Sequence, residues 1–207
     1  MTHLDRLAAL DMEARFRVRV IAGILKGRRL RCPDGLAVRP TSDRLRETLF
    51  NILGHRVDAA RGLDACAGTG ALGIEALSRG AAQVVFVEPS EAAATVISGN
   101  LSDCHLEGPT VIVQGTLPAA ASHTELAEPF DLILLDPPYD DPQIGAILSS
   151  IAPRLKRGGT LVLERSKRAP SPESPSVAVV RTVQAGDSVL DFYQASGGSS
   201  VTTRVTE

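Results

Sequence analysis

The sequence lacks the marks of membrane, exported and metal-binding proteins. No apolar run approaches the roughly 20 residues that a membrane-spanning helix needs. The first residues contain no charged stretch followed by an apolar one, the pattern of an export signal. The three cysteines are odd in number and lack the spacing of metal ligands. We therefore expect a cytoplasmic protein with reduced thiols, no membrane contact and no metal.

Charge is distributed unevenly along the chain. The 207 residues have a net charge of −2 and a hydrophobic content of 43%, enough to bury the core of one large domain. Residues 15–56 contain eleven Arg or Lys against three Asp or Glu, whereas residues 57–207 contain ten against eighteen. A segregated basic segment is typical of proteins that bind a polyanion in a salt-sensitive manner. A solvated surface hairpin would carry the same charges, so this alternative stays open.

The basic segment has the pattern of a hairpin followed by a helix. Residues 17–30 begin with alternating basic and apolar side chains, which suits a half-exposed strand that turns back on itself. A turn follows at residues 33–35, and residues 41–43 are of the types that begin helices. The apolar stripe of this helix consists of Leu45, Leu49, Ile52 and Leu53. Arg44 and Arg46 lie off the stripe, where they would be free to meet a ligand.

From residue 62 onward, strand-like and helix-like patterns alternate. Strands are expected at residues 62–67, 83–88, 110–114, 130–136 and 160–164, with two more near residues 177–184 and 189–194. Helices are expected at residues 71–79, 91–101, 117–127 and 142–155. The alternation predicts a mainly parallel α/β sheet with right-handed crossovers. We expect a flexible leader at residues 1–14 and a disordered tail at residues 196–207.

The first of these strands leads into a loop with three glycines, Gly68, Gly70 and Gly73. The G-x-G-x-x-G spacing by itself would also suit a nicotinamide dinucleotide. Two carboxylates favour S-adenosylmethionine instead. Asp64 would repel a phosphate but would pair with the cationic amino-acid portion of this donor. Glu88 ends the next strand, where it would accept hydrogen bonds from two ribose hydroxyls.

The tetrapeptide Asp136-Pro137-Pro138-Tyr139 directly follows the apolar strand of residues 130–135. Ligands of open α/β sheets bind at this carboxyl edge of the strands. An exocyclic amine becomes nucleophilic when both of its N–H groups donate to acceptors, and the Asp136 carboxylate and the Pro137 carbonyl can accept them. The prolines hold these acceptors in place, and Tyr139 can stack on the base. Asp136 alone could equally be a helix N-cap, but its position behind a glycine loop favours a catalytic lip.

With these motifs the chain resembles the bacterial 16S rRNA guanine-N2-methyltransferases. The segments that carry the resemblance are Arg19–Gly23, Gly27–Leu30, Arg39–Asn51, Gly68–Gly80 and Asp136–Tyr139. The resemblance implies a Rossmann-like class I S-adenosylmethionine-dependent methyltransferase with a seven-stranded, mostly parallel sheet. It also implies an N-terminal β-hairpin and helix extension that binds RNA. The expected substrate is one guanine of 16S rRNA, either naked or in a small-subunit particle.

The motifs and the resemblance together lead to a hypothesis that assigns roles to three groups of residues. The catalytic residues would be Asp136, Pro137, Pro138 and Tyr139. The donor would contact Asp64, Ala65, Gly68, Thr69, Gly70, Glu88, Pro89, Gly115 and Thr116. The RNA would contact Arg28, Arg29, Arg39, Thr41, Arg44 and Arg46. Where relatives often carry an acidic or amide residue for the donor adenine, this chain has Gly115-Thr116, so the adenine contact would fall to the backbone or to the Thr116 hydroxyl. Residues 15–56 would form the extension and residues 57–195 the methyltransferase domain of a monomer.

Several rival functions share some of these features. An N6-adenine methyltransferase acting on RNA or DNA is the nearest alternative, because the lip suits either amine. Cytosine-C5 methylation needs a cysteine nucleophile, usually beside a lip proline, where Tyr139 stands here. Cys66 has no adjoining His or basic residue to lower its pKa, so we interpret it as a small packing residue. A non-catalytic RNA-binding assembly factor is a further alternative, against which the intact donor-site and lip carboxylates argue.

Overall fold

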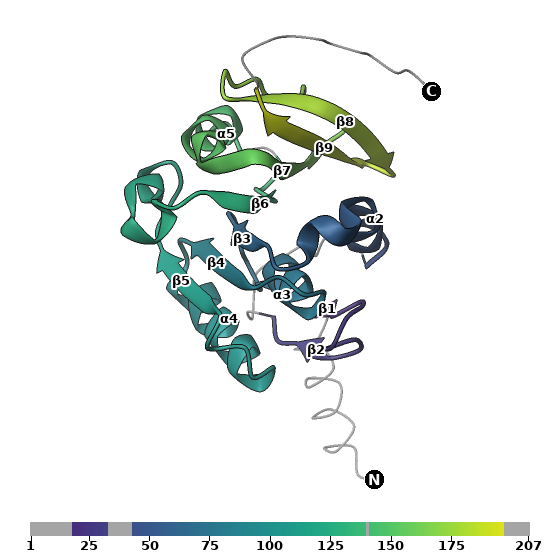
Figure 1. Cartoon of the computed structure of the whole chain (residues 1–207), viewed down its shortest axis with the longest axis vertical. Coiled ribbons are helices and arrows are strands. Elements are labelled where there is room, and N and C mark those ends of the chain that lie inside the picture. The colour runs from purple at the N-terminus through teal and green to yellow at the C-terminus, as the bar shows by residue number, and fades with distance from the viewer. Residues whose placement is uncertain (1–17, 33–42, 140, 197–207) are drawn as a thin grey trace, which may run out of the picture.

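A seven-stranded sheet with the order β5-β4-β3-β6-β7-β9-β8 forms the centre of the computed structural model (Figure 1). The structure describes residues 18–32, 43–139 and 141–196. The strands are β3 (Arg61–Asp64), β4 (Gln83–Glu88), β5 (Thr110–Gln114), β6 (Phe130–Leu135), β7 (Leu155–Ser166), β8 (Val177–Ala185) and β9 (Ser188–Ala195). Strands β3 to β7 pair in parallel, whereas β9 is antiparallel to both β7 and β8. The predicted seven-stranded, mostly parallel sheet is therefore confirmed.

Helices cover both faces of this sheet. They are α2 (Asp43–Leu53), α3 (Ala71–Ser78), α4 (Glu91–Asp103) and α5 (Ile144–Ile151), with 3-10 turns η1 (Gly54–Val57), η2 (Ala119–Ser122), η3 (Thr124–Leu126) and η4 (Ala152–Arg154). Strand side chains alternate between the faces. Val84 and Phe86 of β4 accordingly join the core cluster under α2, α3 and α4, while Val85 and Val87 join the cluster under α5. Burial on both faces explains the apolar character of these strands.

Two helices differ from expectation. The helix predicted for residues 117–127 is wrong, because the structure has only the turns η2 and η3 there. His123 between them is extended, with ψ 142°, and its Nδ1 accepts the Glu125 N–H at 3.3 Å, so the backbone is diverted from helical bonding. The helix predicted for residues 142–155 is shorter than expected. Its last turn becomes η4, which contains Pro153, a residue without the N–H that helical continuation needs.

The N-terminal hairpin is present, but its ladder is short. Strands β1 (Val18–Arg19) and β2 (Arg29–Leu30) pair antiparallel, and residues 20–28 between them lie against α3 (Figure 1). The fully buried Glu75 accepts the backbone N–H groups of Ile21 at 2.7 Å and Ala22 at 3.0 Å. The Ser78 hydroxyl accepts the Leu25 N–H at 3.0 Å. These bonds hold the hairpin on the sheet domain. The predicted leader, the turn at residues 33–35 and residues 197–207 of the predicted tail lie outside the described residues.

A buried amide joins the end of the hairpin to the glycine loop. Asn100 of α4 accepts the Arg31 N–H at 2.7 Å through Oδ1. Its Nδ2 donates to the carbonyls of Arg31 at 3.1 Å and Thr69 at 3.0 Å. Asn100 is 1% exposed; its bond to the Thr69 carbonyl is buried and its two bonds to Arg31 are partly buried. The hairpin and the loop therefore share one anchoring side chain.

Candidate active site

A cavity of about 930 Å³ opens at the carboxyl edge of the sheet. Most of its lining comes from the loops after β3, β4, β5 and β6 and from the turn between β8 and β9, with further residues from the hairpin, α2, α5 and β7. From β3 the chain first adds β4 and β5 on one side, and it then adds β6 and β7 on the other. Such a topological switch point is where open α/β sheets bind their ligands. The cavity lies at the upper end of the range for small-molecule sites, about 300–1,000 Å³.

The glycine loop is shaped by left-handed backbone. Gly68 has φ +55° and Gly70 has φ +77°, a region in which a Cβ would be strained. The third glycine has a different role. A Cβ on Gly73 would lie 2.3 Å from Cε1 of Phe86, so this position allows α3 to pack closely on β4. The first two glycines therefore form the loop, and the third brings the helix onto the sheet.

Glu88 connects the end of β4 to this loop. Its side chain lines the cavity, and one oxygen accepts the Gly68 N–H at 2.8 Å while the other accepts the Ser90 N–H at 2.9 Å. A carboxylate offers about four lone-pair sites, so acceptor capacity remains on both oxygens. Gly115 and Thr116, at the end of β5, line the same part of the cavity. The predicted contact of Glu88 with ribose hydroxyls is compatible with this geometry.

Asp64 stands behind the cavity wall. It is 1% exposed, and its Oδ2 accepts the Gly73 N–H at 2.8 Å, which anchors the start of α3. Its Oδ1 has no hydrogen-bond partner within the described part of the chain. Burial, with a contribution from the charge of Glu88, raises the pKa of Asp64 to about 7. Asp64 and Gly70 are the predicted donor residues that do not line the cavity; direct pairing of Asp64 with a cationic ligand stays a prediction.

We expect Asp64→Asn to remove a pH dependence of stability. Because the pKa is raised in the folded state, between about pH 4 and pH 7 the folded chain holds a proton that the unfolded chain has lost. The wild-type free energy of unfolding should therefore fall as pH rises through this window, by on the order of 4 kcal/mol. Denaturant unfolding at pH 4, 5.5, 7 and 8 would measure the difference between the two proteins.

Asp131→Asn is a control of opposite sign. Partial burial pushes the pKa of Asp131 up, but hydrogen bonds from Lys156 and the Arg61 N–H outweigh it and lower the pKa. Asp131 therefore contributes stability that is lost as pH falls, whereas Asp64 makes the folded state less stable as pH rises. If Asp64→Asn and the wild type lost stability equally between pH 4 and pH 7, a raised pKa at Asp64 would be contradicted.

The tetrapeptide lip follows β6 at the middle of the cavity. All four residues line it, with Asp136 half-buried, Pro137 buried and Pro138 exposed. The hydroxyl of Tyr139 donates to Oε1 of Glu164 at 2.8 Å and also contacts the Ser188 hydroxyl. These bonds tie the Tyr139 ring to β7 and β9, so its orientation is fixed by residues far away in the sequence.

Glu164 and Ser188 were missed by the sequence analysis. Glu164 is 5% exposed and lines the cavity, as Ser188 does. A signal for Glu164 was present, because it is the last residue of a predicted strand, the position that also singled out Glu88. Ser188 follows the β8–β9 turn and carries no comparable signal. Its closeness to Tyr139 depends on the antiparallel pairing of β9 with β7.

Cys66 lines the cavity but is not a reactive thiol. Burial raises its pKa, and the nearby carboxylates of Asp64 and Asp136 raise it further. Nucleophilic attack requires the thiolate, which is disfavoured under these conditions. The site therefore offers carboxylates, backbone carbonyls and an aromatic ring rather than a sulfur nucleophile. Within the described ranges, no cluster of three or more His, Cys, Asp or Glu side chains could hold a metal, and no helix is long and apolar enough to cross a membrane.

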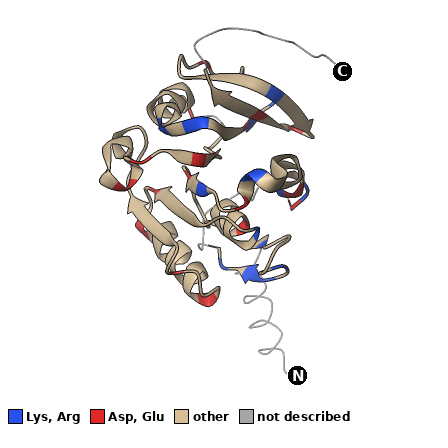
Figure 2. Cartoon of the chain, in the orientation of Figure 1, with Lys and Arg blue, Asp and Glu red and all other residues tan. Residues whose placement is uncertain are grey.

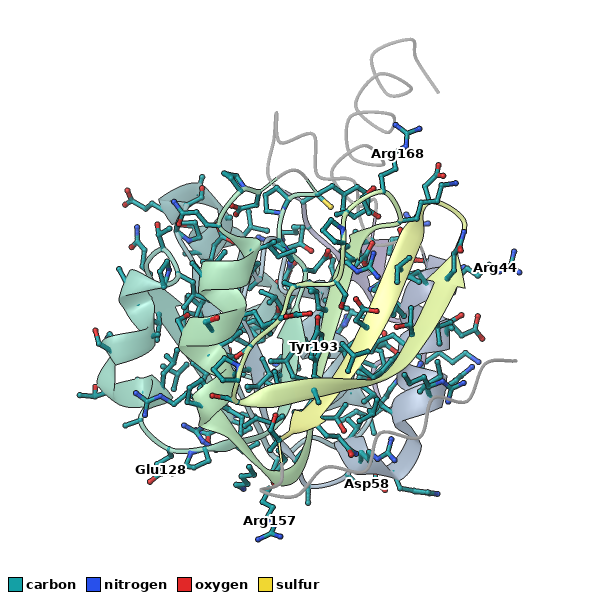
Figure 3. All side chains as sticks on the ribbon, turned by 90° about the horizontal axis from the view of Figure 1, so that it is seen from above. Arg44, Asp58, Glu128, Arg157, Arg168 and Tyr193 are labelled. Atoms are coloured by element: carbon teal, nitrogen blue, oxygen red, sulfur yellow. The ribbon has the colours of Figure 1, made fainter. Side chains whose placement is uncertain are left out.

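The predicted RNA-binding residues fall into two environments. Arg28 and Arg29 are exposed on the hairpin, and Arg44 is exposed on α2, where Figure 3 shows it extending outward. Figure 2 shows basic residues on both the hairpin and α2. Arg46 differs, because it is 1% exposed, so the prediction that it lies free off the buried stripe is wrong. It lines the cavity instead. The two remaining residues of the group, Arg39 and Thr41, lie outside the described residues.

Comparisons with known proteins agree with this arrangement. A family described as conserved hypothetical protein 95 matches residues 18–194. The Bacillus subtilis protein named "Putative rRNA methyltransferase YlbH" is 36% identical over 76% of this chain and 87% of its own length. The ribosomal RNA small subunit methyltransferase D of Haemophilus influenzae is 40% identical over 61% of this chain and 66% of its own. The structure of the Escherichia coli protein yhhF has a TM-score of 0.74 and 33% identity, and covers 86% of this chain and 97% of its own.

Proposed function

This chain belongs to the conserved hypothetical protein 95 family, that of the small-subunit ribosomal RNA methyltransferases D, and from that premise we propose its reaction in detail. It transfers a methyl group from S-adenosylmethionine to the exocyclic N2 of a guanine in 16S rRNA. Its sheet has the Rossmann-like class I methyltransferase fold that the sequence predicts. The observation that carries the proposal is one cavity in which the glycine loop, Glu88 and the lip line neighbouring parts of the wall.

The donor fits the loops after β3, β4 and β5. Gly68 leaves the backbone open to a close ligand, and Glu88 has acceptor capacity for ribose hydroxyls. Gly115 and Thr116 are available to the adenine. The sulfonium group of S-adenosylmethionine supplies an already activated methyl, so the chain needs to position the acceptor amine and receive a proton.

The lip is suited to position that amine. The Asp136 carboxylate and the Pro137 carbonyl accept the two N–H groups of N2, which turns the nitrogen lone pair toward the methyl carbon. A nitrogen–carbon bond forms as the sulfur–carbon bond breaks, and the surplus proton leaves the nitrogen toward Asp136 or water. Tyr139 is held by Glu164 and Ser188, and stacks on the base that the lip receives.

Product identification tests this proposal. The protein and a labelled donor would be incubated with naked 16S rRNA and with small-subunit particles from a strain lacking the corresponding enzyme. The modified nucleoside in the digested RNA would then be identified by mass spectrometry. N2-methylguanosine is the expected product. N6-methyladenosine would replace the proposal by its nearest alternative, and RNA binding without methyl transfer would favour a non-catalytic assembly factor.

A further inference from the structure

Arg46, which lines the cavity, has side-chain hydrogen-bond donors without a partner among the described residues. Its Nη2 donates to Oδ1 of Asp43 at 2.7 Å and to the Arg19 carbonyl at 2.9 Å. Its Nε and Nη1 are buried and have no hydrogen-bond partner in the described part of the chain. The side chain is 1% exposed, and buried charged donors without partners are costly and rare in folded proteins. The arrangement is understandable if a ligand accepts these donors.

The position of Arg46 indicates whether this ligand is the methyl donor or the target base. In the sheet order, β5, β4 and β3 lie on one side of the lip strand β6, and β7 and β9 lie on the other. The proposed donor occupies the first side. Arg46 lines the cavity together with Val18 of the hairpin, Glu164 of β7 and Ser188 of β9, none of which belongs to the donor loops. Because Arg46 also lies outside the donor loops, we assign it to the part of the cavity beyond the lip, where the target base would lie.

We propose that Arg46 donates a hydrogen bond to O6 of the target guanine and so selects guanine over adenine. This inference rests on the proposed function. When N2 lies in the lip, guanine presents the O6 acceptor on the far side of N1, whereas adenine held in the lip by its N6 presents only C2–H at that place. A guanidinium carries only donors, so it pairs with O6 of guanine and finds no acceptor there on adenine. The lip suits either exocyclic amine, and Arg46 supplies the distinction that the lip lacks.

The test compares guanine with 2-aminopurine, which keeps the N2 amine and N7 but has neither O6 nor the N1 proton. Either base would be placed at the target position of the rRNA, as identified by the product analysis. We expect wild-type kcat/KM to be about 10- to 100-fold lower for 2-aminopurine. In Arg46→Met this ratio should fall to the value set by the intrinsic difference between the two bases, because the guanine rate falls while the 2-aminopurine rate changes little. Intrinsic differences between the two amines cancel in this cycle of protein and substrate changes.

Arg44→Met is the matched control, because this exposed arginine lies on the same helix. It should weaken RNA binding for both bases equally and leave their ratio as in the wild type. A contact between Arg46 and a phosphate would behave in the same way, and an unchanged ratio in Arg46→Met would overturn the proposal. Thermal unfolding and binding of S-adenosylhomocysteine would verify that each variant is folded. Arg46→Lys, a milder change, would replace Arg46→Met in the comparison if the latter does not fold.

The wild-type measurement is decisive even if the variants do not fold. Equal wild-type rates on guanine and 2-aminopurine would mean that O6 is not contacted, which would overturn the inference while leaving the proposed reaction intact. Absence of N2-methylguanosine from the natural substrate would instead remove the proposed reaction itself. The two failures are thus distinguishable.

Discussion

Asp136→Ala is expected to lower the rate of methyl transfer by about 10³-fold or more, because it removes one of the two acceptors that align the amine. Donor and RNA binding should change only a few-fold, since Glu88 and the exposed arginines are untouched. Single-turnover transfer from labelled donor would measure the chemical step. Calorimetry with S-adenosylhomocysteine and filter binding of the RNA would measure the two affinities separately.

Two further variants sharpen this experiment. Asp136→Asn keeps one acceptor oxygen but introduces an amide donor, so we expect an intermediate loss of rate. Asp141→Asn changes another carboxylate of the cavity, whose Oδ1 accepts the Gln143 N–H at 2.8 Å, and should cost less than about tenfold because the amide keeps an acceptor oxygen. A tenth or more of wild-type rate in Asp136→Ala would contradict a catalytic lip. Loss of RNA binding in parallel with activity would instead point to a structural role.

Gly23→Ala is expected to detach the hairpin from α3. Gly23 has φ +81°, and a Cβ there would lie 1.8 Å from the backbone oxygen of Ser78, which accepts the Ile24 N–H at 2.8 Å. The added Cβ and the hydrogen bond between the Ile24 N–H and the Ser78 oxygen are sterically incompatible. The hydrogen bonds from this turn to α3 should therefore be lost. Gly27→Ala is the matched control, since Gly27 has φ +85° but a Cβ there meets nothing within 4 Å. It should cost only the left-handed backbone strain of about 1–2 kcal/mol.

Two measurements compare these variants: the protection of the hairpin amides from hydrogen exchange, and the affinity for RNA. Hydrogen exchange of residues 18–32 should accelerate strongly in Gly23→Ala and little in Gly27→Ala. Because Arg28 and Arg29 would lose their fixed position, RNA affinity should fall by about tenfold or more and its dependence on salt should become shallower. Similar behaviour of the two variants would refute the docking role assigned to Gly23.

Much of the fold could be predicted from local sequence. Strands β4 and β5 begin and end where expected, because runs of Val and Ile in a two-sided sheet leave little ambiguity. The lip was recognisable because its four residues are consecutive. The failure at residues 117–127 arose from His123 and its backbone contacts, a local competition that composition does not reveal.

The burial of Arg46 could not be predicted from helical periodicity. The position lies outside the apolar stripe of α2, yet its Nη2 donates to the Arg19 carbonyl of the distant hairpin as well as to Asp43 of the same helix. The anchors of Tyr139 have a similar origin, because Glu164 and Ser188 are brought together by strand pairing across the sheet. Contacts between distant segments decided both cases.

The amide of Asn100 couples the N-terminal hairpin to the glycine loop. If residues up to 31 were removed, its Oδ1 would lose the Arg31 N–H and its Nδ2 would keep only the Thr69 carbonyl. Water would then reach the buried amide of Asn100, and its hydrogen bond to the Thr69 carbonyl would hold the glycine loop less firmly. Deleting the hairpin should therefore also loosen the glycine loop, and we do not expect the two parts to be exchangeable independently in chimeras.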